Sequence, residues 1–200
     1  LDKLAEIVKP QRVLPSSMEF VDIAGLVAGA SKGEGLGNKF LAHIRETNAI
    51  AHVVRCFEND NITHVAGRID PIADIEVIDT ELALADLDTV SKGLDRAEKA
   101  AKSGDKEQRA RADAYKIFLA ALDEGRPIRS LDLDDNARAL LREVSLLTAK
   151  PVLFIANVDE ANLGGNDYSQ RVADYAAKNG AECVVICAAI EAELVSLEAA

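Results

Sequence analysis

Three short apolar segments constrain the fold of this chain more than any other feature. They read AIAHVVRCF at 49–57, PVLFIA at 151–156 and ECVVIC at 182–187. The first is a continuous apolar run of strand length, which is typical of a parallel strand covered on both faces. Segments with helical patterns alternate with these strands, at 38–46, 134–146, 168–178 and from residue 191 onward. The alternation predicts βαβ units and therefore an α/β fold with a mainly parallel sheet.

The middle of the chain has a different pattern, with a seam of apolar residues at alternating spacings of 3 and 4. The seam consists of Leu87, Val90, Leu94, Ala97 and Ala101. It predicts a helix over 74–102, and a second helix is expected over 106–123, after the break at Ser103-Gly104-Asp105. Two helices with so short a connection predict an antiparallel helical hairpin inserted into the α/β domain. We therefore expect three parts: 1–73, the hairpin at 74–125, and 126–200.

Composition limits the classes of function. A hydrophobic share of 48% indicates a globular chain, and a net charge of −11 argues against broad, sequence-independent nucleic-acid binding. Local basic patches at Arg109/Arg111 and Arg126/Arg129 stay possible beside the simpler interpretation of solvated charges. No apolar run is long enough for a transmembrane helix, and the first residues lack the pattern of a signal peptide. We expect a cytoplasmic protein with reduced cysteines, read here as an internal fragment because an initiator Met is absent.

A glycine-rich run follows a predicted strand at 17–23. It reads DIAGLVAGASKGEGLGN over residues 22–38, and five glycines fall within 13 residues. Asp22 at the strand end could hold Mg²⁺, and Gly25 could bring its backbone N–H close to a phosphate because glycine has no Cβ. Leu26 has no donor or acceptor, so it cannot orient an attacking water as a glutamine would. The run predicts a sensor for the terminal phosphate of a nucleotide.

Two further strand ends carry candidate contacts to a base. Asn157-Val158-Asp159-Glu160 follows the strand at 151–156, where guanine-specific hydrolases carry N-K-x-D. Replacement of Lys by Val158 and of Asp by Glu160 predicts relaxed or adenine-favouring recognition, while an ordinary acidic loop is the alternative. Ala188 lies in a small-residue turn after the next strand. Because ligands of such folds bind beyond the carboxyl ends of strands, we expect Asp22, Asn157 and Ala188 in one crevice.

His64 follows the predicted strand at 49–57 by a short polar loop. A surface histidine and a role in positioning water are equally good interpretations of this residue. His43 and His52 lie in a predicted helix and a predicted strand, where structural roles are favoured.

Taken together, these motifs resemble a known family. The run FVDIAGLVAGASKGEGLGNKFLAHIRE at 20–46 is similar to the Obg superfamily of P-loop hydrolases. Within it, AHVVRCFENDNITHVAGRIDP at 51–71 and the NVDE box at 157–160 resemble the YchF/Obg-like ATPase family. The resemblance extends over essentially all 200 residues. It implies a P-loop NTPase-like fold that carries the predicted helical hairpin as an insertion.

The resemblance also implies roles for residues of the glycine-rich run and of the loop at 58–64. Asp22 would be the Mg²⁺-associated carboxylate, Gly25 the γ-phosphate sensor and Leu26 a hydrophobic substitute for the usual glutamine. His64 would be the replacement catalytic residue. Mg²⁺ would be the cofactor.

For the base, the resemblance implies a box that tolerates adenine. Asn157, Val158 and Glu160 would form it, with Val158 contributing backbone, and Ala188 would add a contact from the next strand end. Family members prefer or accept ATP over GTP and associate with ribosomes. The implied partners are therefore ATP, GTP more weakly, and the ribosome, expected at its large subunit.

One motif of the family is absent from the 200 residues, namely the phosphate loop G-x-x-x-x-G-K-[ST]. We therefore expect this polypeptide alone to bind nucleotide poorly and to hydrolyse almost none. Two alternatives stay open. One is a guanine-specific Obg-type GTPase, and the other is a non-catalytic module that binds a partner through the helical hairpin.

Overall fold

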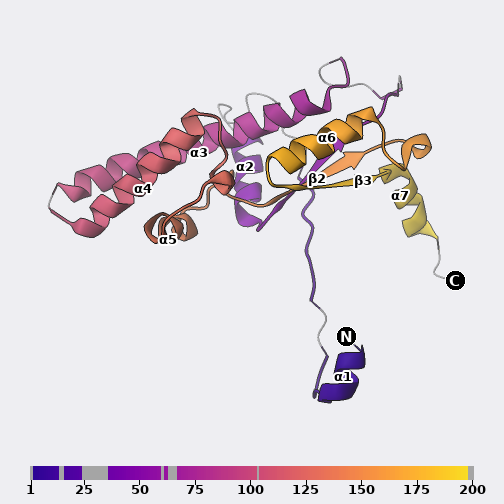
Figure 1. Cartoon of the computed structure of the whole chain (residues 1–200), viewed down its shortest axis with the longest axis horizontal. Helices are drawn as coiled ribbons and strands as arrows, with labels where there is room; N and C mark the ends of the chain where they lie inside the picture. Colours follow the sequence, from indigo (N-terminus) through magenta and orange to yellow (C-terminus); the bar gives the residue numbers. More distant parts are fainter. Residues whose placement is uncertain are drawn as a thin grey trace.

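The computed structural model describes residues 2–13, 16–23, 36–59, 61–62, 67–102 and 104–197. Helices and a small sheet alternate along these residues, as the apolar pattern predicts (Figure 1). The elements are α1 (Asp2–Val8), α2 (Leu36–Glu46), β1 (Ile50–Arg55), α3 (Pro71–Ala101), α4 (Lys106–Asp123), η1 (Ile128–Ser130), α5 (Asp135–Glu143), β2 (Val152–Asn157), η2 (Glu160–Asn162), α6 (Asp167–Lys178), β3 (Glu182–Ile186) and α7 (Ala188–Ser196). In the part of the chain that the structure describes, no helix combines the length and the apolar character needed to cross a membrane.

The three predicted apolar strands form one parallel sheet in the order β1-β2-β3. Val54 lies opposite Ala156, which in turn lies opposite Val185. All three carboxyl ends therefore meet at the same edge. The prediction of a parallel α/β sheet is confirmed.

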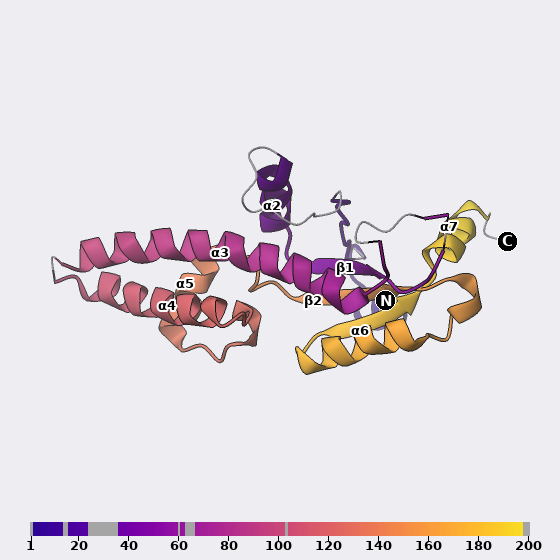
Figure 2. The same cartoon turned by 90° about the horizontal axis from the view of Figure 1, so that it is seen from above.

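One face of the sheet is covered by α6 and by the first half of α3 (Figure 2). Val54 and Phe154 on this face are buried against Ile75 of α3 and Val172 of α6. Tyr175 of α6 packs edge-on against the Phe154 ring, with centroids 5.8 Å apart. This layer is the core of the α/β part.

The opposite face of the sheet is open, which corrects the expectation that the strands are covered on both faces. Val53 and Val184 lie on this face by the register of the strands, and they are 59% and 41% exposed. None of the described helices buries them. An apolar run therefore predicted the strand correctly, while the number of covered faces depends on elements that the pattern does not specify.

The predicted helical hairpin is present, and α3 connects it to the sheet. The second half of this 31-residue helix packs along α4, with Val90, Ala97 and Phe118 buried between them. Gly104 turns the chain with a positive φ of 86°, which glycine tolerates, and Asp105 caps α4 by accepting from two backbone N–H groups. The hairpin points away from the sheet (Figure 1). The boundary at residue 73/74 stays a prediction; α3 is continuous across it.

The predicted strand at 17–23 is wrong. Residues 16–23 have no strand assignment, and Met18 is 80% exposed. A strand needs a ladder partner, and β1, β2 and β3 pair only with one another. Smaller corrections concern two helices, because α5 ends at Glu143 instead of continuing to 146, and α7 begins at Ala188 instead of near 191.

Candidate functional site

The carboxyl ends of β2 and β3 bring two of the predicted site residues into contact. The backbone N–H of Ala188 donates a 3.0 Å hydrogen bond to Oδ1 of Asn157. The Asn157 carbonyl accepts from the N–H of Cys56 at 2.7 Å, which ties the same residue to the end of β1. Asn157 is thus held on both sides, so its side chain has a defined orientation at the edge of the sheet.

The side chain of Val158 is buried, whereas that of Glu160 is exposed to a ligand. The Val158 side chain is buried in the core, and its N–H donates to the Ile186 carbonyl at 2.8 Å. Val158 therefore presents no side chain to a base. Glu160 is exposed in the first turn of η2, while the neighbouring Asp159 accepts from Asn162 Nδ2 at 2.5 Å.

A hollow of about 510 Å³ lies beside this box, between the loop after β1 and the start of α6. Its lining consists of Phe57, Glu58, Asp159, Asn162, Asn166, Asp167 and Tyr168. Glu58 accepts from the Tyr168 hydroxyl at 2.7 Å, and this hydrogen bond raises the pKa of Tyr168. Three carboxylates without a basic neighbour in the lining repel phosphate, so the hollow does not suit the phosphate end of a nucleotide.

Asn166 connects the start of α6 to the segment after β1, a role that the sequence interpretation missed. It begins α6 through a capping box with Ser169, and its Nδ2 donates to the Cys56 carbonyl at 2.7 Å. The spacing Asn166-x-x-Ser169 is a recognisable start of a helix. The long-range bond to Cys56 leaves no such signal, because it depends on the pairing of β1 with β2.

Arg55 organises the loop that runs from β1 toward His64. Its guanidinium donates to three backbone carbonyls, those of Phe57, Asn59 and Ile62, at 2.9 to 3.3 Å. It also lies 4.7 Å from the centroid of the Phe57 ring. An arginine inside an apolar strand run was the signal that could have identified this residue.

Three predicted site residues lie outside the described part of the chain: Gly25, Leu26 and His64. Asp22 is described and exposed, and no contact with Asn157 or Ala188 is found in the described residues. The expected crevice is thus built from the two strand ends without Asp22. A single exposed carboxylate still fits Mg²⁺, which proteins often hold through one or two carboxylates with substrate phosphates. The described residues contain no cluster of three or more His, Cys, Asp or Glu that could hold a metal.

Cys56 and His52 have structural roles. Burial raises the pKa of the Cys56 thiol to about 12, so the group is protonated at neutral pH, as is typical of a buried structural cysteine. Burial also lowers the pKa of His52, although Asp79 and Asp74 oppose this effect. Both results agree with the interpretation of these residues as parts of the core.

Comparisons with known proteins point to one family. Residues 5–84 match a family model described as "50S ribosome-binding GTPase". A "Ribosome-binding ATPase YchF" of Haemophilus influenzae is 57% identical over 99% of this chain and 54% of its own length; its Bacillus subtilis counterpart is 48% identical over 99% and 55%. A solved YchF GTPase of Schizosaccharomyces pombe matches with a TM-score of 0.80 and 32% identity, over 98% of this chain and 55% of that one.

The chain thus spans about half the length of the relatives it matches. The similarity includes the sheet, the helical hairpin and the NVDE box, because it covers 98–99% of the 200 residues. The resemblance stated from the motifs is confirmed. Over 98–99% of its residues, this chain belongs to the YchF family.

Proposed function

We propose that this chain is the central part of a ribosome-associated, Mg²⁺-dependent hydrolase that prefers ATP and accepts GTP more weakly. The hydrolase would act in the cytoplasm as a nucleotide-dependent switch. The observation that carries the proposal is the base box at the ends of β2 and β3, where Asn157 is fixed by Ala188 and Val158 is turned into the core. The names of the relatives and of the matching family model support the ribosome as partner.

The base box favours adenine tolerance for a chemical reason. Guanine presents an N1–H and an N2 amine, and a site specific for guanine needs a carboxylate acceptor placed for both. Asp159 is engaged by Asn162, and Glu160 lies exposed with a longer side chain than aspartate. The Val158 side chain lies in the core, so it cannot pack along a base as lysine would. These features remove the guanine-specific contacts without excluding adenine.

Hydrolysis would proceed by in-line attack of water on the γ-phosphate. Mg²⁺, when bound, neutralises charge on the phosphate oxygens, and Asp22 is the carboxylate that would hold it. Gly25 would sense the γ-phosphate through its N–H, and Leu26 would leave the water unpositioned. We assign the positioning of water to His64, in the loop whose first residues Arg55 orders.

A competition experiment tests the base preference. In a protein of the relatives' full length that contains this chain, ATP should displace a fluorescent nucleotide at a lower concentration than GTP. Glu160→Asp should shift the preference toward GTP by about 10-fold, which corresponds to about 1.4 kcal/mol for one hydrogen bond. Glu193→Asp, on the exposed face of α7, is the matched control. Strong GTP preference of the unaltered protein would instead favour a guanine-specific Obg-type GTPase.

His64 is tested separately. His64→Ala should lower both intrinsic and ribosome-stimulated turnover while leaving the nucleotide Kd nearly unchanged, because the residue is proposed to act on water alone. Unchanged turnover would remove His64 from catalysis. The 200-residue polypeptide without a phosphate loop should show almost no turnover, and a rate equal to that of the full-length protein would contradict the site assignment.

An excess of basic residues at the tip of the hairpin supports the alternative that the hairpin binds a partner. Residues 92–116 contain eight basic and five acidic residues, in a chain with net charge −11. A groove of about 650 Å³ between α3 and α4 includes Arg96, Lys99 and Arg111 in its lining. We propose this tip as the contact with an anionic surface of the large ribosomal subunit. Charge reversal at Lys99 should weaken ribosome binding and leave nucleotide binding unchanged.

A further inference from the structure

The last turn of α2 meets the body of the molecule at the junction between the sheet and the hairpin. In sequence, α2 begins within the last residues of the glycine-rich run, so it is the described element closest to the proposed phosphate sensor. Leu41 and Ile44 of α2 are buried against Leu82 of α3 and Leu147 of the loop before β2. A movement of the glycine-rich run that displaced α2 would therefore act on this junction.

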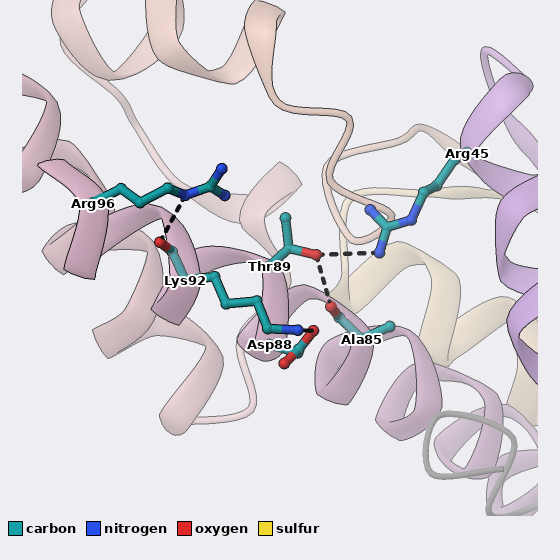
Figure 3. Close-up of polar contacts among 6 residues, drawn as sticks. All are labelled: Arg45, Ala85, Asp88, Thr89, Lys92 and Arg96. Atoms are coloured by element: carbon teal, nitrogen blue, oxygen red, sulfur yellow. Dashed lines mark hydrogen bonds and ion pairs between the residues drawn. The ribbon is translucent and has the colours of Figure 1, made fainter. Parts of the chain in front are cut away.

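Arg45 makes the polar contacts of α2 at this junction (Figure 3). Its Nη2 donates to Oγ1 of Thr89 on α3 at 3.2 Å, and its Nη1 donates to the Ser145 carbonyl at 2.8 Å. The Thr89 hydroxyl donates to the Ala85 carbonyl at 3.0 Å, which directs its oxygen lone pairs toward the guanidinium. One side chain thus bridges three segments: α2, α3 and the loop that leads into β2.

Thr89 lies where the part of α3 that packs on α2 passes into the part that forms the core of the hairpin. Thr89 precedes Val90, which is buried in the hairpin core, and it follows Leu82, which packs with α2. One turn earlier, the buried Asp86 carboxylate accepts from Leu147 N–H, Thr148 N–H and Thr148 Oγ1 at 2.7 to 2.9 Å. These bonds fix α3 to the loop before β2.

The hydrogen bonds of Arg45 can be exchanged for bonds to water more easily than those of Asp86. Arg45 is half-buried, its two acceptors are neutral, and water can take the place of either. Lys150 holds the end of α2 by donating to the carbonyls of Arg45 and Thr47. The junction therefore combines buried hydrogen bonds at Asp86 with more exposed, exchangeable hydrogen bonds at Arg45.

We propose that Arg45 is the positioning residue that couples the nucleotide state of the glycine-rich run to the helical hairpin. The inference rests on the proposed function, because it needs a nucleotide to bind. With Arg45 on Thr89 and Ser145, a displacement of α2 is transmitted to α3 where the hairpin begins. Without this contact, the packing of Leu41 and Ile44 on Leu82 remains, and it transmits only part of the displacement.

Hydrogen exchange of the hairpin tests the coupling in a protein of the relatives' full length that contains this chain. Exchange rates of peptides from α3 and α4 would be compared with a non-hydrolysable ATP analogue and without nucleotide. Coupling between sites usually corresponds to a 5- to 150-fold effect, so we expect nucleotide to change the opening equilibrium by about 5-fold or more. In Arg45→Ala the change should become clearly smaller, while the analogue still binds. Arg45→Lys should restore only part, because lysine has no planar fork for two acceptors.

A matched control lies directly beside Thr89 on α3. Asp88 accepts from Lys92 at 2.7 Å on the exposed side of the same helix (Figure 3). Asp88→Asn should leave the nucleotide response unchanged. If Arg45→Ala disturbs folding, Thr89→Val removes one of the two hydrogen bonds from the other side and should reduce the response in the same direction, by a smaller amount. The double variant should show the same response as Arg45→Ala alone.

The outcomes separate the two proposals. An analogue that does not bind the unaltered protein overturns the proposed function and the coupling with it. Binding without any change in hairpin exchange overturns the coupling alone. A full response in both Arg45→Ala and Thr89→Val shows that another contact carries the signal and overturns the assignment to Arg45.

Discussion

The hairpin and the sheet are two regions that complete their cores differently. In the hairpin, α3, α4 and α5 bury Val90, Phe118 and Leu140 in one closed cluster. The sheet buries one face under α3 and α6 and leaves Val53 and Val184 of the other face exposed. Helices that are neighbours in sequence bury one another's apolar residues. A parallel sheet buries its two faces only where helices from other parts of the chain pack on them.

The largest expected effect is on the closed core of the hairpin. Phe118→Ala removes a fully buried ring and should lower the free energy of unfolding by about 3–5 kcal/mol. Ile117→Ala, one residue away and 46% exposed, should cost far less. Urea unfolding of both variants measures the difference. Equal costs for the two variants would show that the hairpin core is not closed.

The anchor between the two regions comes next. Asp86→Asn replaces one acceptor oxygen by an NH₂ group that faces the N–H and hydroxyl of Thr148, which leaves buried donors unsatisfied. We expect a loss of about 2–3 kcal/mol. Asp88→Asn on the exposed side should cost less than about 0.5 kcal/mol. If the two variants unfold at the same urea concentration, the hairpin and the sheet are not joined through Asp86.

A smaller effect is expected on the pH dependence of stability, through His52 on the covered face of the sheet. Burial lowers the pKa of His52, so between this lowered value and the ordinary value of about 6.5 the unfolded chain binds more protons than the folded one. Stability should therefore fall as pH decreases below about 6.5, with a slope of at most about 1.4 kcal/mol per pH unit. His52→Gln should remove this part of the pH dependence. Identical urea midpoints from pH 7.5 to 5.5 in the unaltered protein would contradict it.

The smallest effect is expected on the open face. Val53→Thr keeps the β-branched shape of a side chain that is mostly exposed, so stability should change by less than about 0.5 kcal/mol. If the variant loses more than 1 kcal/mol in a full-length protein, another element covers this face there. The same substitution would then measure how much that element contributes.

Much of the fold followed from local patterns in the chain. The apolar runs predicted the three strands within two residues, and the seam from Leu87 to Ala101 predicted the hairpin because both helices are close in sequence. The strand at 17–23 was wrong because strand propensity does not supply a ladder partner. Sequence also predicted that Asn157 and Ala188 meet, since strand ends of a parallel sheet share an edge. It missed Asn166, Arg55 and Asp86, whose main contacts are with backbone groups that only the tertiary fold or the loop conformation positions.

The insertion of the hairpin has a consequence for the order of folding. Ile50 pairs with Val152, so the first two strands must find each other across more than a hundred residues of chain. Closing so long a flexible loop costs conformational entropy and slows the search, whereas adjacent helices associate quickly. Once α3 and α4 have paired, they fold back on themselves and bring the ends of the intervening segment close together. The hairpin therefore shortens the loop that the sheet has to close, and variants that weaken it should slow the formation of a sheet they do not touch.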